Sequence, residues 1–498
     1  MQYLCQNLRM QVYVSRKNIT FNPDPSRVIA RFLFTDDQRA INTIRFVLEM
    51  SEKDASFTIK QTLRDYSMRH RNISKIFEKH FNRVAHLCSH LNTEPDAIDY
   101  SKKILIGSYF TMEYSIESAA FFNPSIVEHP DQTEINPGAK RVIISFRATG
   151  EGHISSIVFR TGIIDKANKL SLEPIGNMLE EAERIRRHTY NKKLFAHKIN
   201  EMQKLHGIIP PELILDKLSE EFTYGELRKC IEEARKAVHL ASDKEYLFNQ
   251  IIWLASSHYE LQFSLDTNIS ERVIFPVSAN EKNGIEDARF VKFKNKENET
   301  IYYATYTAYD GTTILPKLLM TEDFYHFEVM PLHGEIARNK GMALFPRKLN
   351  GKYAMLCRLD GFNNYIAFSD NITVWRQAKI LQQPKYAWEL IQIGNCGSPI
   401  ETEEGWLVIT HGVGPMREYV LGASLLDLNN PEKEIGRSKT PLLIPNDKER
   451  EGYVPNVLYS CGSMIHNEDL VIPYAMSDYS STYATVNLRE LLNELLNS

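Results

Sequence analysis

The sequence contains little cysteine, and no arrangement of it that would build a disulfide scaffold or a zinc site. Six cysteines are scattered over 498 residues, without a C-x-x-C pair. Widely spaced cysteines are typical of reduced thiols inside the cell. We therefore expect a cytoplasmic protein with no bound metal.

An excess of basic residues is also absent. The chain carries 59 Lys and Arg against 63 Asp and Glu, a formal charge of -4. Proteins that follow a nucleic-acid backbone need clustered positive charge, so nucleic acid is not an expected partner. No apolar run approaches the ~20 residues that cross a bilayer. The first residues lack a basic stretch followed by an apolar one, so we expect neither a signal peptide nor a membrane partner.

The first hundred residues show the periodicity of helices. Ile41, Ile44, Val47 and Leu48 recur at helical spacing, and Ser51–Asp54 resembles a capping box that opens a second helix. These patterns predict an N-terminal helical unit over residues 1–105.

From about residue 105 the hydrophobic period changes toward two, which is typical of strands. Short β-type runs are separated by Gly, Asn, Asp and Pro turns, at 141–147, 154–161, 301–306, 353–356, 406–410, 420–425 and 470–474. The runs form a loose repeat of roughly 50 residues with three or four strands each, which favours propeller blades over a sandwich. Residues 176–262 return to a helical pattern. We predict a mainly β fold with a first blade at 106–170, a helical insertion at 171–262 and the remaining blades at 263–498.

A propeller gathers residues from every blade around a central funnel, so a site would draw on distant segments. In Gly284–Arg289, adjacent strand residues face opposite sides, and only one of Glu286 and Asp287 would face the funnel together with Arg289. By alternation that residue is Asp287. Taken alone, the segment is more typical of a turn carboxylate paired with an arginine.

Cationic side chains near several strand ends suggest an anion site of the arginine–phosphate kind. The candidates are Arg338, Lys340, Arg358 and Arg417, with His411 and Tyr419 beside them. Ordinary surface charge would explain each of them singly.

As a set, several motifs resemble glycoside hydrolase family 130 over roughly residues 115–490. They are Glu286–Arg289, Asn339-Lys340, Leu344–Pro346, Pro399–Leu407, His411–Val413, Leu425–Leu428 and Tyr453–Val457. The resemblance implies a five-bladed β-propeller and an inverting enzyme acting on β-mannosides. Most members of this family are phosphorylases and some are hydrolases. The helical unit and the insertion fall outside the family's common core.

The resemblance also implies roles for individual residues. Asp287 would be the general acid, delivering its proton through the mannose 3-hydroxyl. Residues implied to line the mannose subsite are Asn123, Arg147, Glu286, Arg289, Arg338, Asn339 and Asp478. Residues implied or suggested to gather around phosphate are Lys340, Arg358, His411, Arg417 and Tyr419.

The sequence departs from the family pattern at Ala288, Gly341, Cys357 and Glu401. Glu401 stands where we expect a phosphate-binding lysine, and a carboxylate ~4 Å from phosphate would repel it by about 1 kcal/mol in water. Such a carboxylate would instead suit an inverting β-mannosidase, as the base that activates water.

Because the other cations are retained, we favour phosphorolysis, with α-mannose 1-phosphate as product. Phosphate is then a co-substrate, an oligosaccharide is the partner, and no cofactor is needed. A non-enzymatic scaffold is a third hypothesis, because a fold alone does not define function. The helical unit and the insertion are candidates for a cap over the funnel or a homo-oligomer interface.

Overall fold

The computed structural model describes residues 12–176, 178–185, 189–193, 195–196, 199, 212–237, 242–278, 281–295, 297–311 and 314–498. Its secondary structure is mainly β, as the sequence predicts. No helix in these ranges is long and apolar enough to cross a membrane.

The N-terminal helices form their own core. They are α1 (Asp37–Glu49), α2 (Glu52–Tyr66), α3 (Ile73–Val84) and α4 (Tyr100–Tyr109), with the 3₁₀ helices η1 (Ala85–Leu91) and η2 (Pro95–Ala97) between α3 and α4. Ser51 caps α2 by accepting a hydrogen bond from the backbone N–H of Asp54, which confirms the predicted cap. The apolar faces of these helices enclose a core that includes Ile44, Phe77 and Phe81. A two-stranded ribbon of β2 (Val28–Phe32) and β3 (Thr111–Ser115) leads from the helices to the β region.

The β region contains five sheets of four or more strands within the described ranges. The first sheet holds β4 (Ala120–Glu128), β5 (Lys140–Thr149), β6 (Ser155–Ile164), β7 (Leu170–Leu172), β8 (Glu180–Glu181) and β13 (Arg272–Ile274). The second holds β9 (Glu183–Ile185), β12 (Tyr259–Gln262), β14 (Ile285–Lys294), β15 (Thr300–Tyr309), β16 (Ile314–Thr321) and β17 (His326–Pro331). The third holds β18 (Ala343–Leu344), β19 (Tyr353–Cys357), β20 (Asn364–Ser369) and β21 (Ala378–Gln382).

The last two sheets complete the set and join the two ends of the described chain. The fourth holds β22 (Gln392–Asn395), β23 (Ile400–Glu401), β24 (Trp406–Val413), β25 (Tyr419–Leu426) and β26 (Glu434–Arg437). The fifth holds β1 (Val14–Arg16), β27 (Leu458–Tyr459), β28 (Met464–His466), β29 (Asp469–Met476) and β30 (Ser480–Asn487). In this sheet β1 pairs antiparallel with β30, so the start of the described chain completes the sheet that the end of the chain builds. The C-terminal helix α9 (Leu488–Leu496) follows β30.

Each sheet packs against the next through a shared apolar core. Phe159 and Phe290 join the first and second sheets, and Phe293 and Met355 join the second and third. The third and fourth sheets share another cluster, and so do the fourth and fifth. A further cluster joins the fifth sheet back to the first. The sheets therefore form a closed cycle of packed neighbours.

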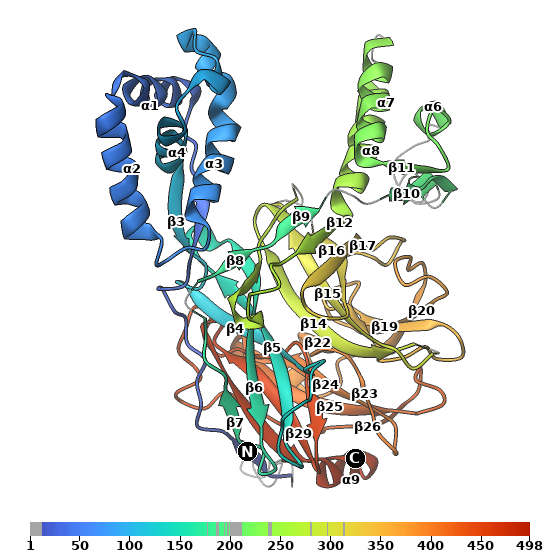
Figure 1. Cartoon of the computed structure of the whole chain (residues 1–498). Helices are drawn as coiled ribbons and strands as arrows, with labels where there is room; N and C mark the ends of the chain where they lie inside the picture. The colour runs from blue at the N-terminus through green and yellow to red at the C-terminus, as the bar shows by residue number, and fades with distance from the viewer. Residues whose placement is uncertain are drawn as a thin grey trace.

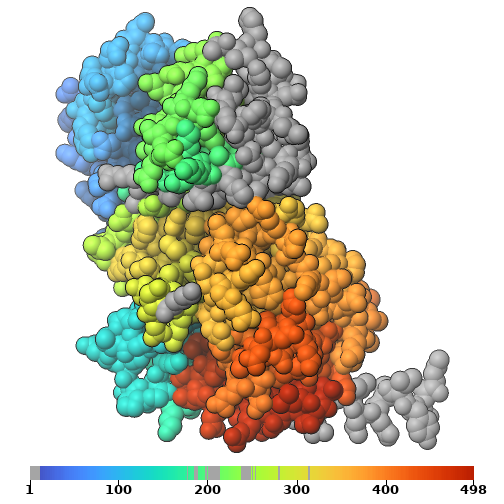
Figure 2. Space-filling model, turned by 90° about the vertical axis from the view of Figure 1, so that its right-hand side faces the viewer, coloured from blue at the N-terminus to red at the C-terminus, as the bar shows by residue number. Residues whose placement is uncertain are grey.

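The segment predicted as a helical insertion is mixed. It contains α6 (Glu212–Leu215), α7 (Tyr224–Ala237) and α8 (Ser242–Ser257), but also a two-stranded sheet of β10 (Thr189–Asn191) and β11 (Glu221–Thr223). Its strands β7 and β8 extend the first sheet, and β9 and β12 extend the second. The prediction of a wholly helical segment is therefore wrong where the structure describes it, and the rest of the segment, mainly 200–211 and 238–241, lies outside the described residues. The N-terminal helices α1–α4 and the helices α6–α8 form two helical units, which project from one end of the β region. Helix α9 lies at the other end (Figure 1). The space-filling view also places both units at that end (Figure 2).

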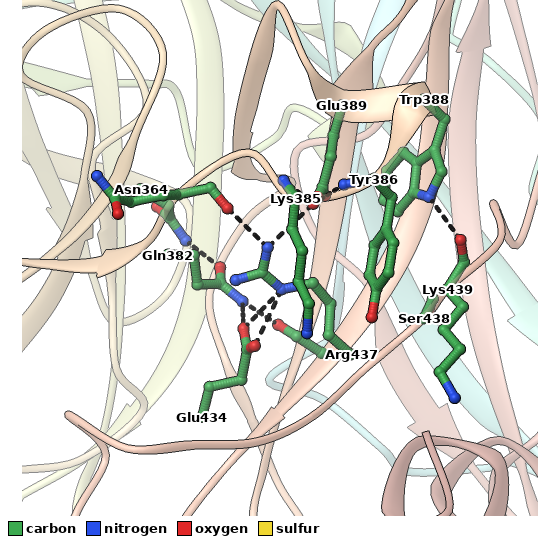
Figure 3. Close-up of polar contacts among 12 residues, drawn as sticks. Asn364, Gln382, Lys385, Tyr386, Trp388, Glu389, Glu434, Arg437, Ser438 and Lys439 are labelled. Carbon is green, nitrogen blue, oxygen red and sulfur yellow. Dashed lines mark hydrogen bonds and ion pairs between the residues drawn. The ribbon is translucent and has the colours of Figure 1, made fainter.

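A buried polar cluster fastens the third sheet to the fourth (Figure 3). The guanidinium of Arg437 donates to both carboxylate oxygens of Glu434, at 3.0 and 2.8 Å, and to Glu389 at 3.0 Å. Gln382 donates to Glu434 and accepts from Asn364 at 2.9 Å, so β20, β21 and β26 are linked. The side chains of Arg437 and Glu389 are 6% and 0% exposed. Removing the cation would leave the carboxylate of Glu389 buried without an opposite charge, which is costly.

We expect Arg437→Met to lower the free energy of unfolding by about 3–5 kcal/mol, because the buried carboxylate of Glu389 and the half-buried carboxylate of Glu434 would lose their cation. The control is Arg347→Met. It breaks the ion pair between Arg347 and Glu401, and each of these side chains is 41% exposed. That control should cost at most about 1 kcal/mol. Guanidinium unfolding followed by tryptophan fluorescence measures both, and equal small losses would contradict the assigned role of the cluster.

Candidate active site

Strand β14 contains an irregularity at the predicted acid. Glu286 pairs with Thr307 and Arg289 with Thr305, so β14 has one more residue than β15 over this stretch. Asp287 takes a φ of +56°, a left-handed backbone conformation that is uncommon for residues other than glycine. An extra residue of this kind is a β-bulge, which redirects side chains.

The bulge overturns the expectation that only one of the two carboxylates faces the site. Arg147 donates to Glu286 Oε1 at 2.7 Å, and its Nη1 lies 3.6 Å from Asp287 Oδ1. Simple alternation would have separated the two carboxylates. Both instead meet one guanidinium from the first sheet.

Asp287 is buried and surrounded by donors. Asn123 of β4, at a φ of +50°, donates from Nδ2 to Asp287 Oδ1 at 2.6 Å. Arg289 donates from Nη1 to the backbone oxygen of Asp287 at 3.1 Å. Burial raises the pKa of the Asp287 carboxyl, but the positive charges of Arg147, Arg289 and Lys340 outweigh burial and hold this pKa below its usual value.

Glu286 connects two of the predicted binding residues. Besides Arg147 it accepts a hydrogen bond from Lys340 Nζ at 2.5 Å. Lys340 follows Asn339, which has a φ of +65° and whose side-chain oxygen accepts from the Lys340 backbone N–H at 2.8 Å. The ammonium expected at phosphate is therefore paired with a carboxylate next to Asp287.

Asp478 lies in the turn between β29 and β30, at a φ of +51°. Burial raises the pKa of its carboxyl to about 6, and the nearby negative charges of Asp287 and Glu286 add to this effect. The positive charges of Arg147 and Arg417 oppose it. Asp478 and Arg417 thus belong to the same electrostatic cluster as Asp287.

A second group of predicted residues gathers around His411 of β24. The ring of Tyr419 stacks on that of His411, with centroids 6.0 Å apart, and the ring of Tyr459 lies at 4.9 Å. The hydroxyl of Tyr459 accepts from Arg289 Nη2 at 2.7 Å, which joins this group to Asp287. Burial, and then the charges of Arg358 and Arg289, lower the pKa of His411 well below its usual value.

Glu401 and Arg338 are not brought into either group. The Glu401 carboxylate accepts two hydrogen bonds from Arg347, at 2.8 and 2.6 Å, and lines a cavity of about 410 Å³ with Phe290 and Ile465. Glu401 pairs with Trp406, five residues before His411 on β24, which corresponds to about 17 Å of strand. Arg338 is exposed, and its side chain has no recorded contact in the described part of the chain.

Sequence reasoning missed Tyr459 and Gln392, both of which contact the predicted residues. Tyr459 follows the Tyr453–Val457 motif by two positions, which is a weak signal. Gln392 begins β22, and its partners come from the third sheet and from β24, so no local pattern indicates it. Among the described residues, no group of His, Cys, Asp and Glu is arranged to hold a metal ion.

The chain belongs to glycoside hydrolase family 130, whose sequence profile, described as beta-1,4-mannooligosaccharide phosphorylase, matches residues 243–497. A 1,2-beta-oligomannan phosphorylase of Thermoanaerobacter sp. is 35% identical over 43% of this chain and 74% of that protein. A beta-1,2-mannobiose phosphorylase of Listeria innocua is 30% identical over 49% of this chain and 68% of that protein. A solved structure of a beta-1,2-mannobiose phosphorylase from Listeria innocua, in complex with beta-1,2-mannobiose, is 21% identical, with a TM-score of 0.45 and coverage of 77% of this chain and 94% of that one.

The raised pKa of Asp478 predicts that the difference in stability between the parent and Asp478→Asn depends on pH. The parent loses stability as the pH rises from about 4 to 6, because its buried carboxyl ionises less readily in the folded state than in the unfolded state. Asparagine stays neutral, so the variant should gain about 3 kcal/mol relative to the parent across this window and keep that gain above it. Melting temperatures of both proteins from pH 4 to pH 8 measure the effect. A difference that does not change with pH would contradict it.

Proposed function

We propose that this protein is an inverting phosphorylase that cleaves short β-1,2- or β-1,4-mannooligosaccharides with inorganic phosphate, releasing α-mannose 1-phosphate. The curated relatives support this proposal, because they include phosphorylases of β-1,2- and β-1,4-linked mannosides. The observation that carries it is the cluster around Asp287, where a buried carboxylate lies among donors from separate sheets.

We propose that the five sheets are the blades of a five-bladed propeller. The closed cycle of packed sheets supports this architecture, as does β1, which completes the last sheet. Blades bury their faces only against their neighbours, so such a ring must close. The division into a helical unit at 1–105, a first blade at 106–170, an insertion at 171–262 and further blades at 263–498 stays a proposal, and β1 would belong with the last blade.

We assign the general acid to Asp287 and the mannose subsite to the residues around it. Asn123, Arg147, Glu286, Arg289, Asn339 and Asp478 would hold the sugar hydroxyls, and Arg338 would approach from the rim. A carboxylate that bonds Asn123 at 2.6 Å has a fixed orientation, which suits proton delivery through a sugar hydroxyl.

The reaction forms one bond and breaks another at the same carbon. A phosphate oxygen attacks the anomeric carbon from the face opposite the leaving group, and the bond to the leaving oxygen breaks with inversion. The proton of Asp287 passes to the mannose 3-hydroxyl, whose own proton goes to the leaving oxygen. Phosphate is the nucleophile, so no protein base is required.

Asp287 must carry a proton for this step, although the surrounding cations favour its ionised form. Phosphate bound at Arg358 brings negative charge into the site, and this charge opposes the effect of these cations on Asp287. The pKa of the acid therefore rises when phosphate binds, and protonation is coupled to the arrival of the nucleophile.

A hydrolase would need a base placed opposite Asp287. Glu401 was the candidate, but its carboxylate is held by Arg347 and lines a cavity to which Asp287 does not contribute. Geometry therefore favours phosphorolysis over hydrolysis by this residue.

The unpaired cysteines Cys88, Cys230, Cys357, Cys396 and Cys461 support a cytoplasmic location, and Cys5 lies outside the described residues. We keep the helical units as a proposed homo-oligomer interface.

Incubation with β-1,2- and β-1,4-mannobiose, with and without phosphate, tests the proposal. We expect phosphate-dependent formation of α-mannose 1-phosphate, detected by ³¹P NMR. Asp287→Asn should lower kcat by about 10²- to 10⁴-fold, because the leaving oxygen is no longer protonated.

The matched control is Asp370→Asn, which makes the same exchange at a side chain that is 85% exposed and should leave kcat unchanged. Sugar release that does not depend on phosphate would eliminate the phosphorylase. Equal activity of parent and Asp287→Asn would eliminate the assigned acid.

A further inference from the structure

Gln392 lies between two of the side chains assigned to phosphate. With its amide oxygen facing the donors, it accepts hydrogen bonds from Arg358 and from His411 Nε2, the latter at 2.8 Å. Its amide nitrogen donates to the backbone oxygen of Gly361 at 3.0 Å. The side chain is thus held at both ends, and it fixes the guanidinium of Arg358.

His411 has no free donor for an anion. Its Nε2–H is used by Gln392, and its Nδ1 lies 3.6 Å from the sulfur of Cys396. Burial raises the pKa of the Cys396 thiol to about 12, so this group keeps its proton beside the ring. His411 is 2% exposed, Tyr419 stacks on its ring, and a Cβ added at Gly394 would lie only 2.6 Å from its Cε1. His411 therefore orients Gln392 and does not itself bind a ligand.

Arg358 differs from Arg147 and Lys340 in the partner it receives. Arg147 and Lys340 are both paired with Glu286, a carboxylate that compensates their charge. Arg358 meets the neutral amide of Gln392, and its buried Nε, like those of Arg147 and Arg289, has no hydrogen-bond partner in the described structure. An anchored guanidinium with uncompensated charge and a free donor is suited to bind an oxyanion.

We propose that Gln392 is a positioning residue for the attacking phosphate. It holds Arg358 in place without neutralising it, and His411 acts through Gln392. The inference rests on the proposed phosphorolysis and changes the role of His411 from phosphate ligand to support.

Steady-state kinetics of Gln392→Leu test this role. Leucine has a similar volume but no group that holds Arg358, so the KM for phosphate should rise about tenfold, as for the loss of one charge-assisted hydrogen bond. The KM for mannobiose and the kcat at saturating phosphate should stay within about twofold. Gln392→Glu should raise the phosphate KM further, because a carboxylate fixes Arg358 but repels the anion. The control Gln383→Leu makes the same exchange at an exposed position and should change none of these constants.

The outcomes separate this inference from the proposed function. A parent whose turnover does not depend on phosphate overturns both. A phosphate-dependent parent with an unchanged phosphate KM in Gln392→Leu overturns the positioning role alone. A parallel change of both KM values and kcat together with a lower melting temperature would indicate a purely structural residue, and would overturn it as well.

Discussion

The extra residue in β14 is the constraint on which the rest of the site depends. It gives Asp287 a left-handed backbone and turns its carboxylate, together with that of Glu286, toward Arg147. In a regular strand the two carboxylates would lie on opposite faces, and one of them would be lost to the site. The strain of such a conformation persists only where the surroundings impose it, and here Asn123 and Arg289 do so.

Charge is distributed unequally along the site. At the Asp287 end, the carboxylates of Glu286 and Asp287 meet Arg147 and Lys340, so these charges are paired. At the His411 end, aromatic rings and the amide of Gln392 surround Arg358, whose charge is not compensated by a carboxylate. One end is therefore suited to a neutral sugar and the other to an anion. Both ends contain arginine, so the difference between them comes from the groups that the cations contact.

Much of the fold could be predicted from the sequence, because the strands carry their own local pattern. The runs at 141–147, 301–306 and 406–410 lie within β5, β15 and β24. The short strands β8, β9 and β12 were missed because pairing with distant strands, rather than their own composition, stabilises them.

The site was predictable where a motif contains the residue and unpredictable where register decides its position. Asp287, Arg147 and Asn123 are brought together as expected. Glu401 lies within the Pro399–Leu407 motif, yet the pairing of β23 with the start of β24 carries it away from His411. Gln392 shows the reverse case, because no motif marks it and three-dimensional pairing alone brings it to Arg358 and His411.

The most direct test of the account is a crystal structure of the protein with α-mannose 1-phosphate bound. We predict that the Asp287 carboxylate lies within hydrogen-bond distance of the mannose 3-hydroxyl, and that the phosphate contacts Arg358 but not the His411 ring. A sugar bound away from Asp287, or a phosphate held by Glu286-paired cations with Arg358 turned aside, would contradict it.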